Sequence, residues 1–351
     1  MKSAFLVGVQ QLEVRNVPAP AVPEDGIVVE VKACGVCGSD LRRWKEGPTA
    51  GAAAIVPGHE IGGVVVAVGP KAVGYAVGEN LAVAPDIHCG HCYYCQRGLY
   101  NLCDSLIILS TTPGYQGGMA EQLALDGNVL RNGCIHRMPP GMSHVQGALA
   151  EPCAAVLSAH HKVSTSLGDT VVVMGSGPIG CLHMQVAKAR GARVILSEPN
   201  KGRRDKALRF GPDAAIDPTT EDVVARVRQL TGDLGADVVV CANPVAITQV
   251  QAVEMVRKGG RVILFGGLPK ASPMVTLNAN LIHYGEITVV GAFSYHPVYH
   301  DMALGLLQRG VISTDVVTHT FPLEQVQQAF ETASSGAGAL KVMVAPSSGA
   351  S

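Results

Sequence analysis

Four cysteines lie close together in the 351-residue sequence, at the spacing C-x2-C-x2-C-x7-C. They are Cys89, Cys92, Cys95 and Cys103. Four thiolates at this spacing are typical of a closed, tetrahedral structural zinc site, and the same spacing would suit an iron–sulfur cluster. Four unligated thiols are a third, less favoured interpretation of so dense a cluster. His88 and His91 exceed the four ligands needed, so we expect both to be solvated.

A second set of candidate metal ligands is spread along the chain. Cys37 follows Cys34 in the sequence CGVCGSD, His59 lies in PGHE, and Glu151 precedes Pro152. A thiolate, an imidazole and a carboxylate are suitable zinc ligands, and a catalytic zinc keeps one position open for water or substrate. Spacing alone does not bring these groups together. A shared metal site, a redox pair of cysteines and an ordinary buried histidine therefore all stay open at this point.

A glycine-rich turn indicates a nucleotide site. Residues 171–174 are apolar, and Gly175, Gly177 and Gly180 follow at the spacing G-x-G-x-x-G, before an apolar run to Arg190. The first glycine permits a tight turn from strand to helix, the second lets the backbone approach a pyrophosphate, and the third lets the helix pack closely on the strand. The pyrophosphate would then lie at the helix N-terminus, where free N–H groups favour an anion.

An acidic residue supports this interpretation. A second apolar run, Arg193–Leu196, precedes Glu198, about 20 residues beyond the first glycine, where a carboxylate accepts the ribose hydroxyls of NAD. The alternative is a generic strand–turn–helix with a surface glutamate. We therefore predict an NAD site in which Glu198 selects NAD over NADP.

Composition excludes several classes of function. The net charge is −1 and 47% of the residues are hydrophobic, so nothing points to binding of nucleic acid or of an anionic membrane. We find no secretory signal and no apolar run long enough to span a bilayer. Ten cysteines in such a chain suggest metal or thiol chemistry rather than disulfides, and we expect a cytoplasmic protein.

The elements that must position these residues fall into two groups. Residues 1–150 are rich in short apolar stretches, prolines and glycines, which predicts a mostly antiparallel β domain. From about residue 155, strands alternate with helices, which predicts a six-stranded, doubly wound parallel sheet of the α/β class. The expected strands are residues 170–174, 193–196, 214–216, 237–241, 261–265 and 287–290. We expect a helix over Ala246–Lys258, and Gly266 lies at a carboxyl edge, the side where ligands bind.

After Gly291 the alternation stops. Helices are expected over Asp301–Gln308 and Leu323–Ala333, followed by a strand over Lys341–Val344. We expect this tail to return to the first domain.

Together these motifs resemble the zinc-containing medium-chain dehydrogenase/reductase family, and most of all its sorbitol/iditol-type polyol dehydrogenases. The resemblance covers almost the whole chain and includes Cys37–Asp40, Gly58–Glu60, the four cysteines, Glu151-Pro152 and Gly175–Gly180, in the family's order. It implies a GroES-like catalytic domain, residues 1–154 and 295–351, with a zinc lobe at about 88–104. It implies a Rossmann NAD-binding domain over residues 155–294.

The resemblance also implies site residues. Cys37, His59 and either Glu60 or a water would hold a catalytic zinc, with Glu151 behind that water or rotating in to bind, and Cys34 would be no ligand. Ser39 is a candidate first proton relay, or alternatively a cap of the local turn. The structural zinc would be held by Cys89, Cys92, Cys95 and Cys103. The nucleotide site would comprise Gly175, Gly177, Pro178, Ile179, Gly180, Glu198, Arg203, Gly266 and Phe293.

The resemblance implies transfer of a hydride from a secondary alcohol (a polyol, cyclitol or sugar) to NAD, giving the ketone. A threonine or amino-alcohol dehydrogenase is the alternative enzyme, and a non-catalytic nucleotide-binding relative is the alternative of another class. A homodimer or homotetramer is expected. Two features differ from the polyol enzymes. Many of them have a histidine two residues after the aspartate, whereas Asp40 is followed by Leu41-Arg42, and Ser294 stands where sorbitol dehydrogenases have an arginine. Arg42 and Arg43 could receive an anionic substrate group or be a solvated pair.

Overall fold

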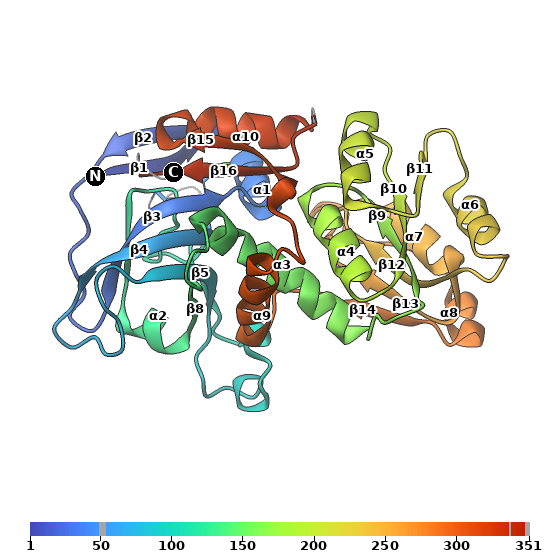
Figure 1. Cartoon of the computed structure of the whole chain (residues 1–351), viewed down its shortest axis with the longest axis horizontal. Helices are drawn as coiled ribbons and strands as arrows, with labels where there is room; N and C mark the ends of the chain where they lie inside the picture. Colours follow the sequence, from blue (N-terminus) through green and yellow to red (C-terminus); the bar gives the residue numbers. More distant parts are fainter. Residues whose placement is uncertain (49–53, 337, 348–351) are drawn as a thin grey trace. The chain divides into compact units, whose positions relative to one another are not determined.

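The computed structural model describes residues 1–48, 54–336 and 338–347. The chain forms two compact units (Figure 1). Unit 1 comprises Met1–Ala154, Tyr295–Gly310 and Val317–Ser351, and unit 2 comprises Ala155–Ser294 and Val311–Val316. The tail after Tyr295 therefore returns to unit 1, except for the short segment Val311–Val316.

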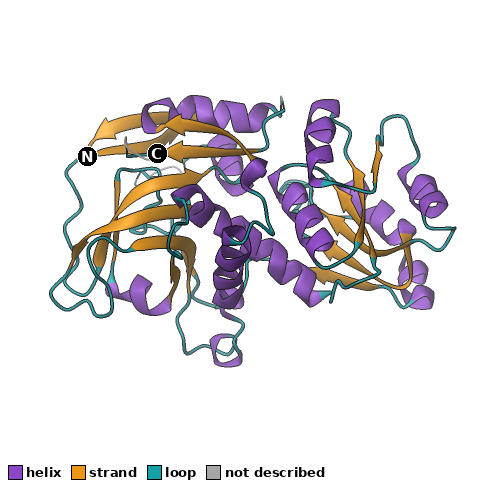
Figure 2. Cartoon of the chain, in the orientation of Figure 1, coloured by secondary structure: helices purple, strands orange, loops and turns teal. Residues whose placement is uncertain are grey.

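Unit 2 is built on a six-stranded sheet in the order β11-β10-β9-β12-β13-β14, and all its neighbouring strands are parallel. This confirms the predicted Rossmann sheet. Figure 2 shows its strands in orange with helices on either side. The inner strands are almost entirely apolar and buried, as a sheet covered on both faces requires.

The elements of unit 2 lie close to the predicted ranges. They are β9 (Thr170–Met174), α4 (Pro178–Ala189), β10 (Arg193–Ser197), α5 (Lys201–Ala207), η3 (Leu208–Phe210), β11 (Ala214–Ile216), α6 (Val223–Leu230), β12 (Ala236–Cys241), α7 (Ala246–Met255), β13 (Val256–Leu264), α8 (Ala279–Gly285), β14 (Thr288–Gly291) and η4 (Thr314–Val316).

One predicted helix end is wrong. The helix expected over Ala246–Lys258 stops at Met255, and the next strand already begins at Val256. Val256 pairs with Ala236 of β12, and the Arg257 side chain donates to Asp237 at 2.6 Å. These tertiary contacts draw the segment into the sheet, because pairing with β12 overrides its local helix preference.

Unit 1 contains a curled, mainly antiparallel sheet with the path β15-β16-β3-β4-β5-β6, to which β7 and β8 add beside β3 and β5. Only β15 and β16 pair in parallel among the paired strands of this sheet that the structure describes. A separate hairpin joins β1 and β2. The predicted β-rich, GroES-like unit is confirmed.

The elements of unit 1 are β1 (Lys2–Gly8), β2 (Gln11–Asn16), β3 (Ile27–Gly35), α1 (Gly38–Glu46), β4 (Glu60–Val68), β5 (Asn80–Ile87), η1 (Cys95–Arg97), η2 (Tyr100–Leu102), β6 (Ile107–Ile108), β7 (Gln122–Leu125), α2 (Gly127–Asn132), β8 (Gly133–Arg137), α9 (Pro297–Gln308), β15 (Val317–Pro322), η5 (Leu323–Gln325), α10 (Val326–Ser335) and β16 (Lys341–Ala345). Helix α3 (His144–Lys162) begins in unit 1 and ends in unit 2.

None of the helices within the described ranges combines the length and the apolar character that crossing a bilayer would need.

Candidate active site and metal centres

Cys37, His59 and Glu60 form a compact group in unit 1. One potential ligand atom of each lies within 4.8 Å of the other two. Strand pairing explains how they meet, because β3 and β4 are antiparallel and place Gly35 opposite Glu60. The chain leaves β3 into Cys37, the residue before α1, and it enters β4 through His59 and Glu60. The sheet thus joins two motifs that are about 20 residues apart in the sequence.

Asp40 holds both halves of this group. One of its carboxylate oxygens lies 3.5 Å from Nδ1 of His59, and the other accepts from the backbone N–H of Cys37 at 3.0 Å. A carboxylate on Nδ1 fixes the tautomer and leaves Nε2 with a free lone pair, which is the usual arrangement behind a metal-binding histidine. The donor set and its orientation therefore fit a zinc ion.

The electrostatics of the pair agree with this geometry. Burial alone would lower the pKa of His59, but the charges of Asp40 and Cys37 raise it well above its ordinary value. Burial alone would raise the pKa of Asp40, but His59 lowers it on balance. Both shifts mean that the anionic surroundings of the imidazole stabilise a positive charge at this point, whether a proton or a metal ion supplies it.

Two serines approach the two nitrogens of His59. Oγ of Ser39 lies 3.5 Å from Nε2, and Oγ of Ser110 lies 3.5 Å from Nδ1. Cys37 occupies the N-cap position of α1, so the alternative capping role of Ser39 is not used. Arg43 donates to the carbonyl of Ser110, whereas Arg42 is exposed.

Glu60 is buried and forms an ion pair with the equally buried Lys341 of β16. The Lys341 ammonium also donates to the carbonyl of Val36 at 2.9 Å. An unpaired carboxylate at such a position would cost several kcal/mol of desolvation. Lys341 thus neutralises Glu60 and fastens β16 to the loop that carries Cys37.

Glu151 is not part of the compact group, although its surroundings link it to that group. It lies in α3, and its Oε1 accepts from the hydroxyl of Tyr295 at 3.1 Å. Burial raises the pKa of Glu151 to about 7, and the negative charge of Glu60 adds to the rise. The charge of Glu60 is therefore felt at Glu151 although the two carboxylates come from different elements.

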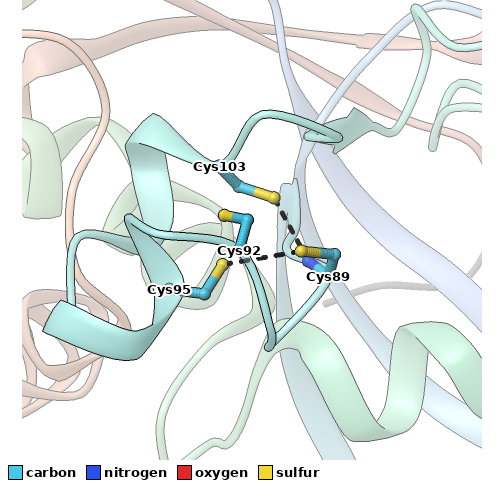
Figure 3. A group of neighbouring side chains, drawn as sticks. All are labelled: Cys89, Cys92, Cys95 and Cys103. Carbon is cyan, nitrogen blue, oxygen red and sulfur yellow. Dashed lines mark hydrogen bonds between the residues drawn. The ribbon is translucent and has the colours of Figure 1, made fainter.

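The four cysteines of the lobe do converge (Figure 3). Their sulfur atoms all lie within 4.8 Å of one another, and Sγ of Cys89 is 3.9 Å from Sγ of Cys95. Four Zn–S bonds of about 2.3 Å in a tetrahedron place the sulfurs about 3.8 Å apart. The cluster therefore has the dimensions of a closed zinc site before any metal is added.

Backbone N–H groups donate to sulfur atoms of this lobe. The N–H of Cys89 donates to Sγ of Cys103 at 3.2 Å. Hydrogen bonds from the backbone of Cys95 and Asp104 lower the pKa of Cys92 to about 6. His91 is exposed, as expected, but His88 is half-buried and stacks on Tyr100 at 4.1 Å, so its expected solvation is wrong.

In unit 2 the glycine-rich turn has the predicted backbone. Gly175 adopts φ +102°, and a Cβ at Gly180 would overlap the carbonyl oxygen of Gly175. A Cβ at Gly177 would meet no atom within 4 Å, so this position faces open space. Pro178 begins α4, and the N–H of Ile179 lies in its first turn, where an α-helix supplies no acceptor. The turn therefore fits a pyrophosphate.

Glu198 supports this turn directly. Its Oε2 accepts from the N–H of Ser176 at 2.7 Å and from the Ser176 hydroxyl at 3.1 Å, and its Oε1 accepts from the N–H of Asn200 at 2.8 Å. A carboxylate has about four acceptor positions. Most of them are thus used within the protein, and about one is left for a ribose hydroxyl.

Two of the three remaining predicted nucleotide residues lie just beyond strands, and the third lies in a helix. Gly266 follows β13, where a Cβ would overlap the backbone of Asn243, so it allows a close approach of two loops. Phe293 follows β14 and is 55% exposed. Arg203 lies in α5, and within the part of the chain that the structure describes its buried Nε has no hydrogen-bond partner.

Two family models match the chain. A model described as "Alcohol dehydrogenase GroES-like domain" matches residues 23–132, and one described as "Zinc-binding dehydrogenase" matches residues 178–309. A sorbitol dehydrogenase of Bacillus subtilis is 31% identical over 354 residues, which covers 99% of this chain and 97% of that protein. The chain belongs to the zinc-binding medium-chain dehydrogenases.

Two solved structures that are similar to this chain hold a nucleotide. A zinc-binding dehydrogenase of Sinorhizobium meliloti, bound to NADP, has a TM-score of 0.89 and 32% identity, covering 98% of this chain and 99% of that one. A protein of Escherichia coli CFT073 described as a short chain alcohol dehydrogenase, complexed with NADH, has a TM-score of 0.87 and 25% identity, covering 99% of both chains. The cofactor of this dehydrogenase is accordingly NAD or NADP.

Three contributors to the dehydrogenase's candidate sites were missed from the sequence. Asp40 was visible within the CGSD motif, and its proximity to Cys37 was the available signal. Lys341 and Tyr295 had no signal, because they lie 281 residues from Glu60 and 144 from Glu151.

Proposed function

We propose that this dehydrogenase oxidises a polyhydroxylated secondary alcohol to the ketone with NAD as the hydride acceptor. The observation that carries the proposal is the group of Cys37, His59 and Glu60 with Asp40 behind the imidazole. A thiolate, an oriented imidazole and one position for a small oxygen ligand suit alcohol chemistry.

In this proposal Cys37 and His59 hold the catalytic zinc, and Asp40 keeps the imidazole in the required orientation. When bound, zinc would lower the pKa of the substrate hydroxyl and NAD would accept the hydride. Ser39 is exposed, and its Oγ lies 3.5 Å from Nε2 of His59, so it can accept the hydroxyl proton and pass it to solvent. The carbon loses a hydride and the oxygen a proton, which leaves the ketone.

Glu60 and Glu151 have different roles in the proposal. Glu60 is an ionised carboxylate that is paired with Lys341, and it contributes a negative charge near Glu151. Glu151 accepts a hydrogen bond from Tyr295. Its pKa is raised to about 7, so it can either donate or accept a hydrogen bond, which suits a partner of the water or substrate oxygen at the proposed zinc. Cys89, Cys92, Cys95 and Cys103 would hold the structural zinc.

A polyol is proposed as the substrate for three reasons. The most similar relatives include a sorbitol dehydrogenase at full length. The chain has only 4% aromatic residues, so flat apolar surface for an aromatic or long aliphatic alcohol is scarce. A vicinal diol can also offer two oxygens to one metal ion, which fixes the reacting carbon.

NAD is proposed over NADP because Glu198 lies at the end of β10, where a carboxylate repels a 2′-phosphate. Arg203 is close in sequence and opposes this preference. A cytoplasmic location and a homodimer or homotetramer are further parts of the proposal, and they rest on the resemblance to the family.

The experiment is a panel of substrates with NAD, followed by absorbance of the reduced cofactor. Sorbitol, a cyclitol, 2,3-butanediol, threonine, ethanol and benzyl alcohol would be compared at matched concentrations. We expect the highest kcat/KM for a polyhydroxylated secondary alcohol. Turnover that is best with threonine favours the amino-alcohol alternative, and turnover that is best with ethanol rejects the polyol assignment.

Cys37→Ser and His59→Ala test the proposed ligands of the catalytic zinc. Both should lose nearly all turnover while NAD binding, measured by calorimetry, persists, since the glycine-rich turn lies in unit 2. A variant that keeps the wild-type kcat would show that the proposed ligands are wrong.

A further inference from the structure

A third group of potential metal ligands lies in unit 1, apart from the two sites described above. Cys134 and His136 are two residues apart on β8, so their side chains point to the same face of the strand. His300 comes from α9, which packs against β8. One potential ligand atom of each of the three lies within 4.8 Å of the other two.

The distance between the two imidazoles suits a shared cation. Nδ1 of His136 lies 2.9 Å from Nδ1 of His300. Metal–nitrogen bonds of about 2.0–2.1 Å place two ligand nitrogens about 2.9–3.4 Å apart for bond angles between about 90° and 110°. A metal ion therefore requires only a small separation of the two rings.

The two rings are in the state that metal binding requires. Burial lowers the pKa of His300 to about 3 and also lowers that of His136. Both imidazoles are thus neutral near pH 7, with lone pairs to donate. His300 is fully buried, and its Nε2 has no hydrogen-bond partner among the described residues. Buried polar groups usually have a hydrogen-bond partner, so a nitrogen left without one among the described residues calls for an explanation.

The surroundings of the thiol are anionic. Burial raises the pKa of Cys134, and the nearby carboxylates of Asp86 and Glu151 raise it further. The negative charge of Asp301 on α9 acts in the same way on His136. It raises the pKa of His136, whereas burial lowers it. These carboxylates disfavour a bare thiolate, but they favour a divalent cation that binds the thiolate and the two imidazoles together.

We propose that Cys134, His136 and His300 form a third metal site, which takes zinc or a closely similar transition-metal ion with water in the fourth position. Thiolate and imidazole ligands select this class of metal, and hard oxygen-preferring ions such as magnesium are excluded. The metal-free alternative is a hydrogen bond between the two rings that only fastens α9 to β8.

Occupancy of this site also has a consequence for the candidate active site. The ring of Tyr295 lies nearly parallel to that of His300, at 8° with 6.3 Å between the ring centres. The hydroxyl of the same Tyr295 donates to Glu151. A metal that fixes His300 thereby limits the movement of Tyr295 and of the carboxyl group it holds.

The test is the number of zinc ions per chain in the purified full-length protein, after equilibration with micromolar zinc and removal of the excess by gel filtration. His136→Ala is the first variant, since His136 is only half-buried and the variant is expected to fold. We expect the wild type to retain one zinc more than His136→Ala. His319→Ala is the matched control, a half-buried histidine of β15 outside every cluster among the described residues. It should retain as much zinc as the wild type.

A second measurement does not depend on the stoichiometry. Zinc that binds only the folded state raises the melting temperature. The proposal expects a zinc-dependent rise in the wild type and in His319→Ala that is reduced in His136→Ala and in Cys134→Ala. Equal zinc content in the wild type and in His136→Ala overturns the proposal, as does an equal response of their melting temperatures. Either result would mean that the two rings are held together only by the hydrogen bond between them.

Discussion

The carboxylate of Asp40 lies 3.5 Å from Nδ1 of His59, and its other oxygen accepts from the backbone of Cys37 at 3.0 Å. One side chain therefore orients both an imidazole and the loop that presents a thiol. The four-cysteine lobe has no share in this arrangement, so the two proposed zinc sites can be perturbed separately.

Asp40→Asn should weaken zinc binding at the Cys37/His59 site by about 10- to 100-fold, the usual effect of removing a carboxylate behind a metal-binding histidine. The substitution keeps the shape of the side chain. Zinc retained per chain during titration with a chelator would measure the effect, together with kcat. Asp315→Asn, at an exposed aspartate, is the control. Wild-type zinc retention in Asp40→Asn would show that Asp40 does not position a ligand.

Cys103→Ser should lower stability before it affects chemistry. A closed four-thiolate site contributes folding free energy and has no open position for substrate. We expect a lower melting temperature and one zinc fewer per chain. His91→Ala, at an exposed residue within the same lobe, should leave both unchanged. If Cys103→Ser keeps the wild-type melting temperature and zinc content, the four cysteines bind no metal.

Glu198→Ala should change cofactor preference. The wild type is expected to have a higher kcat/KM with NAD than with NADP, and the variant should shift the ratio toward NADP by about tenfold, or ~1.4 kcal/mol. Glu198 also supports the turn through Ser176, so efficiency with NAD should fall as well. Arg203→Ala should shift the ratio in the opposite direction. A wild type that uses NADP as well as NAD would contradict the assignment of Glu198.

Two buried histidines of unit 2 should make the protein sensitive to acid. Nε2 of His160 lies 3.0 Å from Nδ1 of His183, and burial lowers the pKa of His160 to about 3 and that of His183 well below its usual value. The unfolded chain takes up a proton on each near pH 6.5, whereas the folded chain does not. Stability is therefore complete above about pH 6.5 and falls as the pH drops, by up to ~1.4 kcal/mol per pH unit for each histidine.

His183→Leu removes one of these two groups. Its melting temperature at pH 7.5 should fall, because Nε2 of His160 loses its partner, but its further decrease between pH 7 and pH 5 should be smaller than in the wild type. The slope of melting temperature against pH is the quantity to compare. His161→Ala, at an exposed residue of α3 next to His160, should keep the wild-type slope. An unchanged slope in His183→Leu would mean that the acid sensitivity has another origin.

The sequence was sufficient to predict a site wherever the residues of that site lie close together in the chain. The four cysteines of the lobe lie within one short segment, so their spacing alone indicated a closed site. The turn at Gly175–Gly180 was predictable for the same reason, because each glycine meets a steric demand of its own neighbours. The parallel sheet followed from apolar runs that alternate with helical segments.

Tertiary structure alone decided the contacts between distant segments. The partner of Glu60 is Lys341, the partner of Glu151 is Tyr295, and His300 joins Cys134 and His136 from the other end of the sequence. No local pattern marks these contacts, since each is made only when β16, α9 or the residues just before α9 pack against the N-terminal part of unit 1. The early start of β13 at Val256 has the same cause, because pairing with β12 outweighs the helix preference of the segment.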